Sequence, residues 1–125
     1  MVKSFPTPFR HIGALSGATV PPEGGICKIL ANGSVEDLSG GGAAVAHAVF
    51  KRQREDDGLA EVDNAIVASF AGEAGNTPSI GDTVYVVNAN TISTNSSAGS
   101  RPELGKCVGF APDGTYYVFV KGLLS

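Results

Sequence analysis

The segment Ser79-Ile80-Gly81-Asp82-Thr83-Val84-Tyr85-Val86-Val87-Asn88-Ala89-Asn90-Thr91-Ile92-Ser93-Thr94 carries the pattern of a complete β-hairpin. A Gly-Asp turn opens it, a run of β-branched and aromatic residues follows, and an Asn-containing turn precedes a polar return strand. Two more strands are expected after it, in residues 104–110 and 115–120, joined by a Pro112-Asp113-Gly114 turn. The last third of the chain therefore predicts an antiparallel β-meander.

The composition extends this prediction to the whole chain. With 125 residues, 17 glycines, seven prolines, one Met and no Trp, the chain suits a single all-β domain of short strands and turns. The fold class expected is a small antiparallel β-barrel or sandwich. A net charge of −3 argues against nucleic acid as the main partner. The one basic cluster, Lys51-Arg52-Gln53-Arg54, is followed at once by Glu55-Asp56-Asp57.

No membrane partner is expected either. No apolar run approaches the roughly 20 residues that a membrane-spanning helix needs. Pro6, Pro8, Arg10 and His11 interrupt the region that would be the apolar part of a signal peptide. The sequence therefore predicts a chain that begins at or near Met1 and carries no membrane segment.

Residues 1–25 are expected to form an extended N-terminal arm, and residues 26–125 the β domain. Four prolines and several glycines predict little regular structure in this arm. Apolar residues nevertheless recur along it, so it should lie against a surface. That surface is either the arm's own domain or a neighbouring subunit or larger partner. The recurring apolar residues are Phe5, Phe9, Ile12, Leu15 and Val20.

The β domain opens with a hairpin in residues 26–38, for which Asn32-Gly33 is the turn. The segment from Ala43 to Phe50 suits either a helix, with Val45 and Val49 one turn apart, or a strand; we favour the strand. Lys51 to Glu55 continues it, Asp56-Asp57-Gly58 turns the chain, and residues 59–70 return as one long strand.

An internal repeat supports the strand interpretation. Residues 25–35 align with residues 81–91 at an offset of 81 − 25 = 56. Each copy begins with a glycine, continues through an apolar strand and an Asn-containing turn, and returns along a polar strand. A Gly- or Ser-rich loop then leads to another strand. The chain is therefore predicted to contain two similar β units within one barrel or sandwich.

No catalytic or metal-binding pattern is visible, so we expect neither an enzyme nor a cofactor. His11 and His47 have no second His or Cys at ligand spacing. Cys27 and Cys107 lie in predicted strands and are expected to be buried, reduced thiols. The tyrosines alternate with apolar residues and should lie mostly in the core.

Four ordered segments of the C-terminal half resemble one family. They are Ile80-Gly81-Asp82-Thr83-Val84-Tyr85-Val86, Thr91-Ile92-Ser93-Thr94, Leu104-Gly105-Lys106-Cys107-Val108-Gly109-Phe110 and Tyr117-Val118-Phe119-Val120. Their order is similar to the GD-x-VY, T-x-T, IG-x-x-x and V-x-V pattern of small tailed-phage capsid decoration proteins. The segment from Asp57 to Phe70 also resembles the strand that precedes the Gly-Asp turn in that family. With the first hairpin included, the resemblance extends over residues 25–120.

The resemblance implies a non-enzymatic virion protein that binds the outer surface of an expanded icosahedral capsid and stabilises the shell. Its partners would be the major capsid protein and its own copies, as a homotrimer. The alternative is a β-barrel module of a phage fibre or tail that binds carbohydrate or a cell surface. For the capsid or intersubunit contact we predict apolar anchors and polar contacts, namely Phe5, Phe9, Ile12, Leu15, Lys51, Arg52, Arg54 and Asp56.

Overall fold

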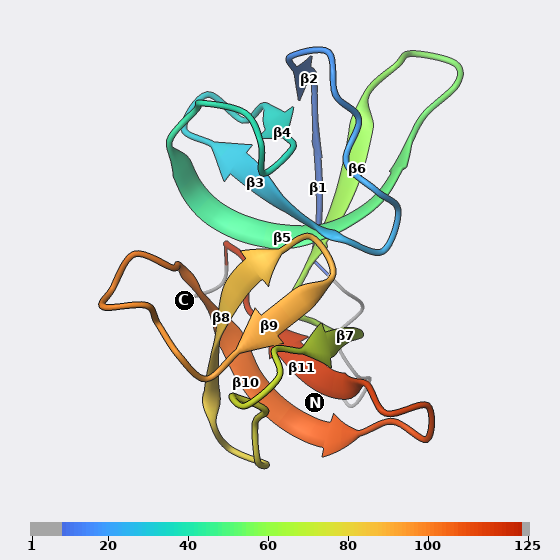
Figure 1. Ribbon diagram of the computed structural model, residues 1–125. Helices are drawn as coiled ribbons and strands as arrows, with labels where there is room; N and C mark the ends of the chain where they lie inside the picture. The colour runs from blue at the N-terminus through green and yellow to red at the C-terminus, as the bar shows by residue number, and fades with distance from the viewer. Residues whose placement is uncertain (1–8, 124–125) are drawn as a thin grey trace, which may run out of the picture.

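The computed structural model describes residues 9–123, which form strands, turns and loops without a helix. The strands divide into a curled six-stranded sheet and a closed five-stranded barrel, one above the other in Figure 1. This arrangement confirms the predicted all-β class. Within residues 9–123, no helix is long and apolar enough to cross a membrane.

The strands of the first unit (residues 9–64) and of the second unit (residues 66–120) follow each other in the chain. The first unit contains β1 (Phe9–Gly13), β2 (Leu15–Ser16), β3 (Ile26–Leu30), β4 (Val35–Glu36), β5 (Ala44–Gln53) and β6 (Ala60–Asn64). The second contains β7 (Ile66–Gly72), β8 (Thr83–Asn88), β9 (Thr91–Ser93), β10 (Glu103–Phe110) and β11 (Tyr116–Val120).

The two units share one strand order. The first sheet runs β1-β6-β5-β3-β4-β2, and the barrel runs β7-β11-β10-β8-β9 before closing from β9 back to β7. In the barrel, β7 pairs with β11 along most of its length and with β9 in parallel at its end. In the first unit these two pairings are made by two separate strands: β1 pairs with β6, and β2 pairs in parallel with β4. The chain between them is a single residue, Ala14.

The pairing register repeats as well. Leu15 pairs with Val35 in the first unit, and Gly72 pairs with Ile92 in the second. In their pairings with β6 and β11, β5 and β10 each carry a register shift at the matching place, between Phe50 and Arg52 and between Cys107 and Gly109. Matching positions differ by 66 − 9 = 57 before the last turn and by 116 − 60 = 56 after it. The structure therefore confirms two similar β units.

The predicted offset of 56 for the first hairpin is wrong by one residue. Gly24, with a φ of 79°, corresponds to Gly81, with a φ of 92°. Each donates its N–H over 2.8 Å to the matching carbonyl, that of Phe50 or that of Cys107. A positive φ is accessible to glycine without steric cost, so this position keeps its glycine in both units. Gly25, which the sequence alignment placed over Gly81, corresponds to Asp82.

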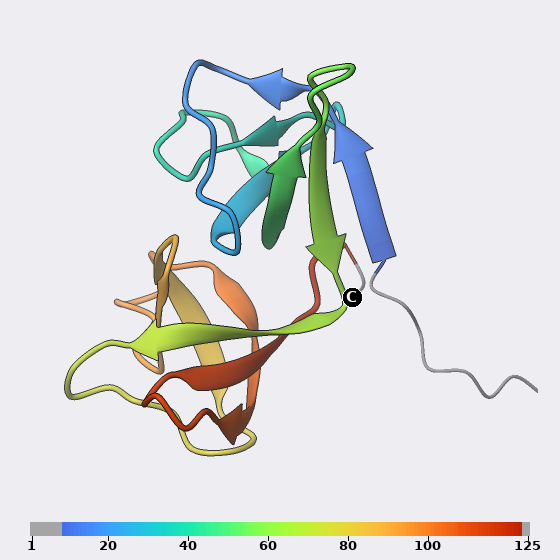
Figure 2. The same cartoon turned by 90° about the vertical axis from the view of Figure 1, so that its right-hand side faces the viewer.

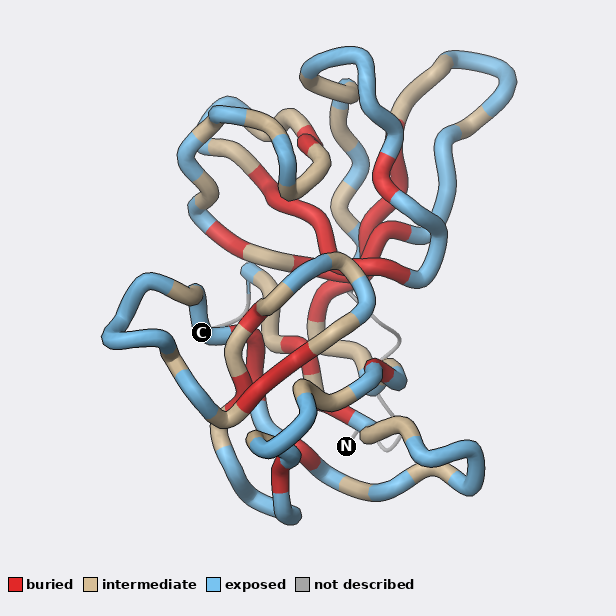
Figure 3. The backbone as a smooth tube through the Cα atoms, in the orientation of Figure 1, coloured by how far each residue is buried: buried red, intermediate tan, exposed pale blue. Residues whose placement is uncertain are grey.

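Each unit has its own core, and the second core extends across the seam between them. The first core is built around Phe50, Ile29 and Val62, with three small alanines beside them. In the second core, Ile26 and Val49 of the first unit pack with the barrel's own apolar residues. The Ile26 N–H also donates to the Ala89 carbonyl over 2.8 Å. Figure 3 shows buried stretches along the strands and exposed ones in the outer loops.

Each unit holds a hydrogen-bonded pair of one Ser and one Glu at the same two positions. The position that holds Ser in one unit holds Glu in the other. Ser16 Oγ donates to Glu36 Oε2 over 3.4 Å, whereas Ser93 Oγ donates to Glu73 Oε1 over 2.7 Å. Glu36 pairs with the buried Lys28 ammonium at 2.8 Å. Glu73 pairs with Arg101 at 3.0 Å. Lys28 also donates to the Gly40 and Gly42 carbonyls, which ties the glycine-rich loop to the first sheet, and Arg101 ties the serine-rich loop to Glu73.

The segment from Ala43 to Phe50 is a strand, as we favoured, since β5 begins at Ala44. The long return strand predicted for residues 59–70 is wrong. It is divided at Ala65, whose φ of 54° turns the chain from β6 in one unit to β7 in the other. Figure 2 shows this change of direction.

The predicted arm is also different from the expectation over part of its length. Residues 9–16 form β1 and β2 and complete the first sheet, so the prediction of little regular structure is wrong there. Pairing with β6 and β4 satisfies the backbone groups of these residues, which local composition could not indicate. Residues 1–8, with Phe5, lie outside the described residues.

Candidate functional site

The outer face of β1, β6 and the end of β5 carries the densest set of ionised side chains among residues 9–123. Arg10 lies opposite Asp63, and Ile12 lies opposite Glu61, which also has Arg52 as its neighbour on β5. Opposite residues of an antiparallel pair share one face of a sheet. We call this surface, with the adjoining turn of residues 54–58, the charged face.

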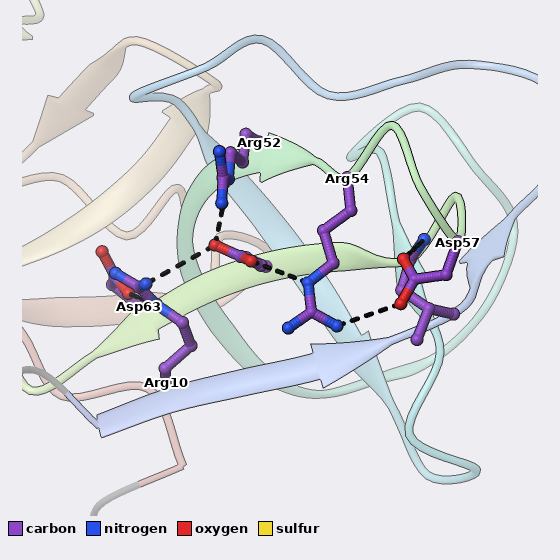
Figure 4. Close-up of polar contacts among 7 residues, drawn as sticks. Arg10, Arg52, Arg54, Asp57 and Asp63 are labelled. Atoms are coloured by element: carbon purple, nitrogen blue, oxygen red, sulfur yellow. Dashed lines mark hydrogen bonds and ion pairs between the residues drawn. The ribbon is translucent and has the colours of Figure 1, made fainter.

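Glu61 is the centre of the charged face. It is only 3% exposed, yet it carries a carboxylate. Arg54 Nε donates to it over 2.8 Å, Arg52 Nε over 3.3 Å and Arg10 Nη1 over 3.5 Å. Figure 4 shows these three arginines directed toward the same part of β6. The hydrogen bonds from Arg54 and then Arg52 lower the pKa of Glu61, so it stays ionised at neutral pH.

Further ion pairs hold the arginines in place. Arg10 Nε donates to Asp63 Oδ1 over 2.9 Å, and this hydrogen bond is the main cause of its raised pKa. Arg54 Nη1 donates to Asp57 Oδ2 over 3.1 Å. Asp57 Oδ1 in turn accepts from the Leu59 N–H, which closes the turn. The guanidinium groups are therefore fixed by acids and are poor candidates for proton transfer, because both partners stay charged.

A shallow hollow of about 690 Å³ lies against the charged face. Its lining includes Arg52, Arg54, Asp56, Glu61 and Glu23. The mixture of both charges, with few apolar side chains, differs from the mainly apolar lining of most small-molecule sites. This hollow suits polar contacts with a protein surface better than capture of a small ligand.

The structure brings several of the predicted contact residues to this one face. Lys51 and Arg52 are exposed on β5, Asp56 is exposed at the turn, and Arg54 is half-buried by its ion pairs. Ile12 is 42% exposed on β1 beside Glu61.

The predicted arm anchors do not act together. Leu15 packs against the first core, because β2 is part of the sheet, so it is not available as an anchor. Phe9 begins β1, and Phe5 lies outside residues 9–123.

The sequence interpretation missed Arg10, Glu61 and Asp63. A signal was present, because Ala60-Glu61-Val62-Asp63 alternates with the period of two that places both acids on one face of a strand. This alternation does not show that the two acids are buried, since their arginine partners lie on other strands. Arg10 and Asp63 are separated by 53 positions in the chain.

The matching outer face of the second unit was missed as well, and it is mainly apolar, with the exposed Lys106 opposite Phe119. Val67 and Phe119 take the places of Arg10 and Asp63, and Tyr117 takes the place of Glu61. Val67 is 51% exposed and Tyr117 is 39% exposed. We call the surface formed by Val67, Val108, Tyr117 and Phe119 the apolar face.

The titratable groups that could serve other chemistry are dispersed. No group of three or more His, Cys, Asp or Glu side chains within residues 9–123 is arranged to hold a metal ion. The His11 ring donates through Nε2 to the Gly33 carbonyl over 2.7 Å. Burial, followed by the nearby Lys28 charge, lowers the pKa of His47. Cys27 and Cys107 are free and buried, as predicted, and burial raises the pKa of Cys27 to about 12.

No family model, curated protein or solved structure matches the chain.

Proposed function

We propose that this chain is a non-enzymatic structural protein of a virion, which binds the outer surface of an expanded icosahedral capsid as a homotrimer and stabilises the shell. The observation that supports this proposal is the charged face. Its arginines are held by Glu61, Asp63 and Asp57, so they lose little conformational entropy when a protein partner binds.

The contacts to the major capsid protein are made by the exposed part of this face. Arg52 reaches Glu61 through Nε while its side chain is 60% exposed, which leaves the outer edge of the guanidinium toward solvent. Lys51 and Asp56 lie nearby with opposite charges. A surface that presents both charges favours a protein with complementary charges over a polyanion. Ile12 adds an apolar contact beside them, and Phe5 and Phe9 stay predicted contacts.

The mechanism of stabilisation is physical. A single subunit contributes a modest contact, but three linked subunits bind as one multivalent ligand with a high effective concentration. A ligand that binds only the closed, expanded lattice stabilises that lattice by mass action. No bond is made or broken in the process.

The test combines mass in solution with binding to capsids. Light scattering should give three times the 12.7 kDa chain mass. The protein should co-sediment with expanded, DNA-free capsids and raise their melting temperature. Lys51→Glu should weaken capsid binding about tenfold or more, since a like charge opposes the partner's acids. The matched variant Lys106→Glu, on β10 of the second unit, should leave binding within about twofold.

Two results would contradict the proposal. One is a chain that does not sediment with capsids at any concentration tested. The other is equal weakening by the Lys51 and Lys106 variants, which would exclude the charged face as the contact. The alternative, a carbohydrate-binding module, has less support, because the hollow against the charged face has no Phe or Tyr side chain in its lining.

A further inference from the structure

The turn between β3 and β4 combines an exposed asparagine with a glycine that the backbone requires. Asn32 is exposed, and Gly33 has a φ of 88°, which residues with a side chain rarely adopt. Outside its chain neighbours, the nearest atom to a Cβ added at Gly33 would be His11 Cε1, at 3.9 Å. The backbone nitrogen of Gly33 therefore has no side chain of its own to shield it and little around it.

The Asn32 side chain is held beside this nitrogen. Its Oδ1 accepts the Ser34 N–H over 3.0 Å, and the ring that this bond closes contains the Gly33 nitrogen. The Ser34 N–H also stabilises negative charge that develops on Oδ1, which makes Cγ a better electrophile. Within residues 9–123 no hydrogen bond holds the Asn32 Nδ2 amide group, so this group can leave without losing a partner.

The other five asparagines lack one or more of these features. Each of them is followed by Ala, Ser or Thr. Asn64 is fully buried, and the Nδ2 of Asn76 is hydrogen-bonded. Asn88, in the turn between β8 and β9, is the nearest equivalent, because its Oδ1 accepts the Asn90 N–H over 2.9 Å, but Ala89 follows it. Only Asn32 joins an exposed side chain, an Asx turn and a following glycine.

We propose that Asn32 is a site of spontaneous deamidation in the folded protein, and that it reacts before the other asparagines. The Gly33 nitrogen gives its proton to hydroxide and attacks Cγ of Asn32. Nδ2 takes a proton from water and leaves as ammonia, which forms a cyclic succinimide. Water then adds to one ring carbonyl, and the ring C–N bond at that carbonyl breaks. Addition at Cγ gives aspartate, whereas addition at the main-chain carbonyl gives isoaspartate.

One hydrogen bond opposes this reaction. The Gly33 N–H donates to the Leu30 carbonyl over 2.9 Å, and this bond must be released before the nitrogen can attack. Its release needs only the turn to open, and exposed turns open at a lower free energy than the strands they join. The folded protein should therefore react more slowly than the unfolded chain at this site.

The conversion acts on the contact that joins this turn to β1. His11 Nε2 lies 2.7 Å from the Gly33 carbonyl oxygen. Isoaspartate adds a backbone atom just before Gly33 and so displaces that carbonyl, whereas aspartate adds only a charge. The isoaspartate form should therefore lose the His11–Gly33 hydrogen bond. This inference does not rest on the capsid proposal, because it concerns the free protein.

The experiment follows each asparagine in the full-length protein by mass spectrometry of digested samples, with a fragmentation method that distinguishes isoaspartate from aspartate. The protein is kept in mildly alkaline buffer until a urea-unfolded sample has converted at Asn32, and circular dichroism checks that it stays folded. Asn32 should convert first, at least about tenfold faster than Asn88, because alanine shields the nitrogen that follows Asn88. An unconverted Asn32, or another asparagine that converts as fast, would overturn the proposal.

Two variants provide the controls. Ala89→Gly removes the shielding Cβ after Asn88, and should raise the rate at Asn88 toward that at Asn32. A slow Asn88 in this variant would contradict the role given to the glycine. Asn32→Asp carries the charge of the aspartate product on an ordinary backbone, so its His11 ring signal in ¹H-¹⁵N spectra should stay in place. The isoaspartate fraction should show a shifted His11 signal, and an unshifted one would contradict the loss of the contact.

Discussion

The charged face of the first unit and the apolar face of the second occupy the same position on the same set of strands. Arg10 and Asp63 form an ion pair in the first unit, where Val67 and Phe119 lie side by side in the second. The backbone register is the same in both. The difference shows that the fold sets where side chains point, whereas the surroundings of each face set which side chains are kept.

The seam between the units shows the same dependence of residue type on surroundings. Ile26 and Val49 of the first unit are buried against the second core. Their counterparts in the second unit, Thr83 and Lys106, face outward with polar groups. Apolar residues occur at this position only in the unit that is covered there.

The largest expected effect on stability comes from truncating a buried side chain in the first core, compared with its counterpart in the second. Phe50→Ala should lower the free energy of unfolding by about 3–5 kcal/mol, because Phe50 is buried among small alanines that cannot fill the space. Its counterpart Cys107→Ala removes only a thiol, and should cost on the order of 1 kcal/mol. Urea unfolding followed by circular dichroism measures both. Equal losses in the two variants would mean that the cores do not differ in packing.

The second prediction concerns a glycine present in one unit only. A Cβ on Gly105 would overlap the Phe119 carbonyl oxygen, whereas the matching residue in the first unit is already an alanine, Ala48. Gly105→Ala should therefore cost about 1–3 kcal/mol through overpacking. Ala48→Gly should cost about 0.5–1 kcal/mol through chain entropy. Thermal melts of both variants give the comparison, and a neutral Gly105→Ala would show that β10 and β11 are not in close contact.

The third prediction compares the two faces directly by double-mutant cycles. The coupling between Arg10 and Asp63 should be about 1 kcal/mol, reduced by the exposure of Arg10, and should weaken at high salt. The coupling between Val67 and Phe119 should be about 0.5 kcal/mol and should not change with salt. Alanine variants unfolded in urea at two salt concentrations supply both values. A salt-independent Arg10–Asp63 coupling would argue that the pair acts through packing.

The last prediction concerns how Glu73 makes stability depend on pH. Hydrogen bonds from Arg101 and then Ser93 lower its pKa to about 2 from an ordinary 4.5. The unfolded chain therefore binds the proton first, and the stability from this group is present above about pH 4.5 and lost as pH falls toward 2. Glu73→Gln should lose less stability than the natural chain between these pH values.

Acid unfolding followed by circular dichroism checks this prediction. Glu36→Gln is the matched variant in the first unit, where Lys28 lowers the pKa of Glu36 in the same direction. Each variant should flatten the acid limb of the stability curve. An unchanged limb in Glu73→Gln would mean that Glu73 has the same pKa in the folded and unfolded chain.

The sequence predicted the elements whose causes are local. Asn32-Gly33, Gly81-Asp82 and Pro112-Asp113-Gly114 mark turns, and the alternation between them marks strands, so the hairpins were found with their approximate ends. The buried free thiols followed from their apolar strands. The repeat was visible because turn glycines and apolar strands recur in the same order, although the offset was wrong by one residue.

Part of the candidate site was also accessible from the sequence. Lys51, Arg52, Arg54 and Asp56 were selected from their cluster, and Arg52, Arg54 and Asp56 line one hollow. Their relation to Glu61 and Asp63 was not selected, since a strand pattern tells which residues share a face but not which strands lie beside it. The sequence pattern also did not indicate that Leu15 pairs with Val35, which is distant in the chain. Leu15 was therefore selected as an anchor although it is part of the sheet.

Local chemistry alone thus determined an all-β chain of two similar hairpin-rich units, since turns and alternation act over a few residues. The tertiary structure decided that residues 9–16 complete a sheet, that the chain changes unit at Ala65, and that one outer face is charged and its counterpart apolar. These features depend on contacts between residues as far apart as Arg10 and Asp63, 53 positions in the chain. Such contacts exist only once the strands have paired, and that is why sequence patterns do not contain them.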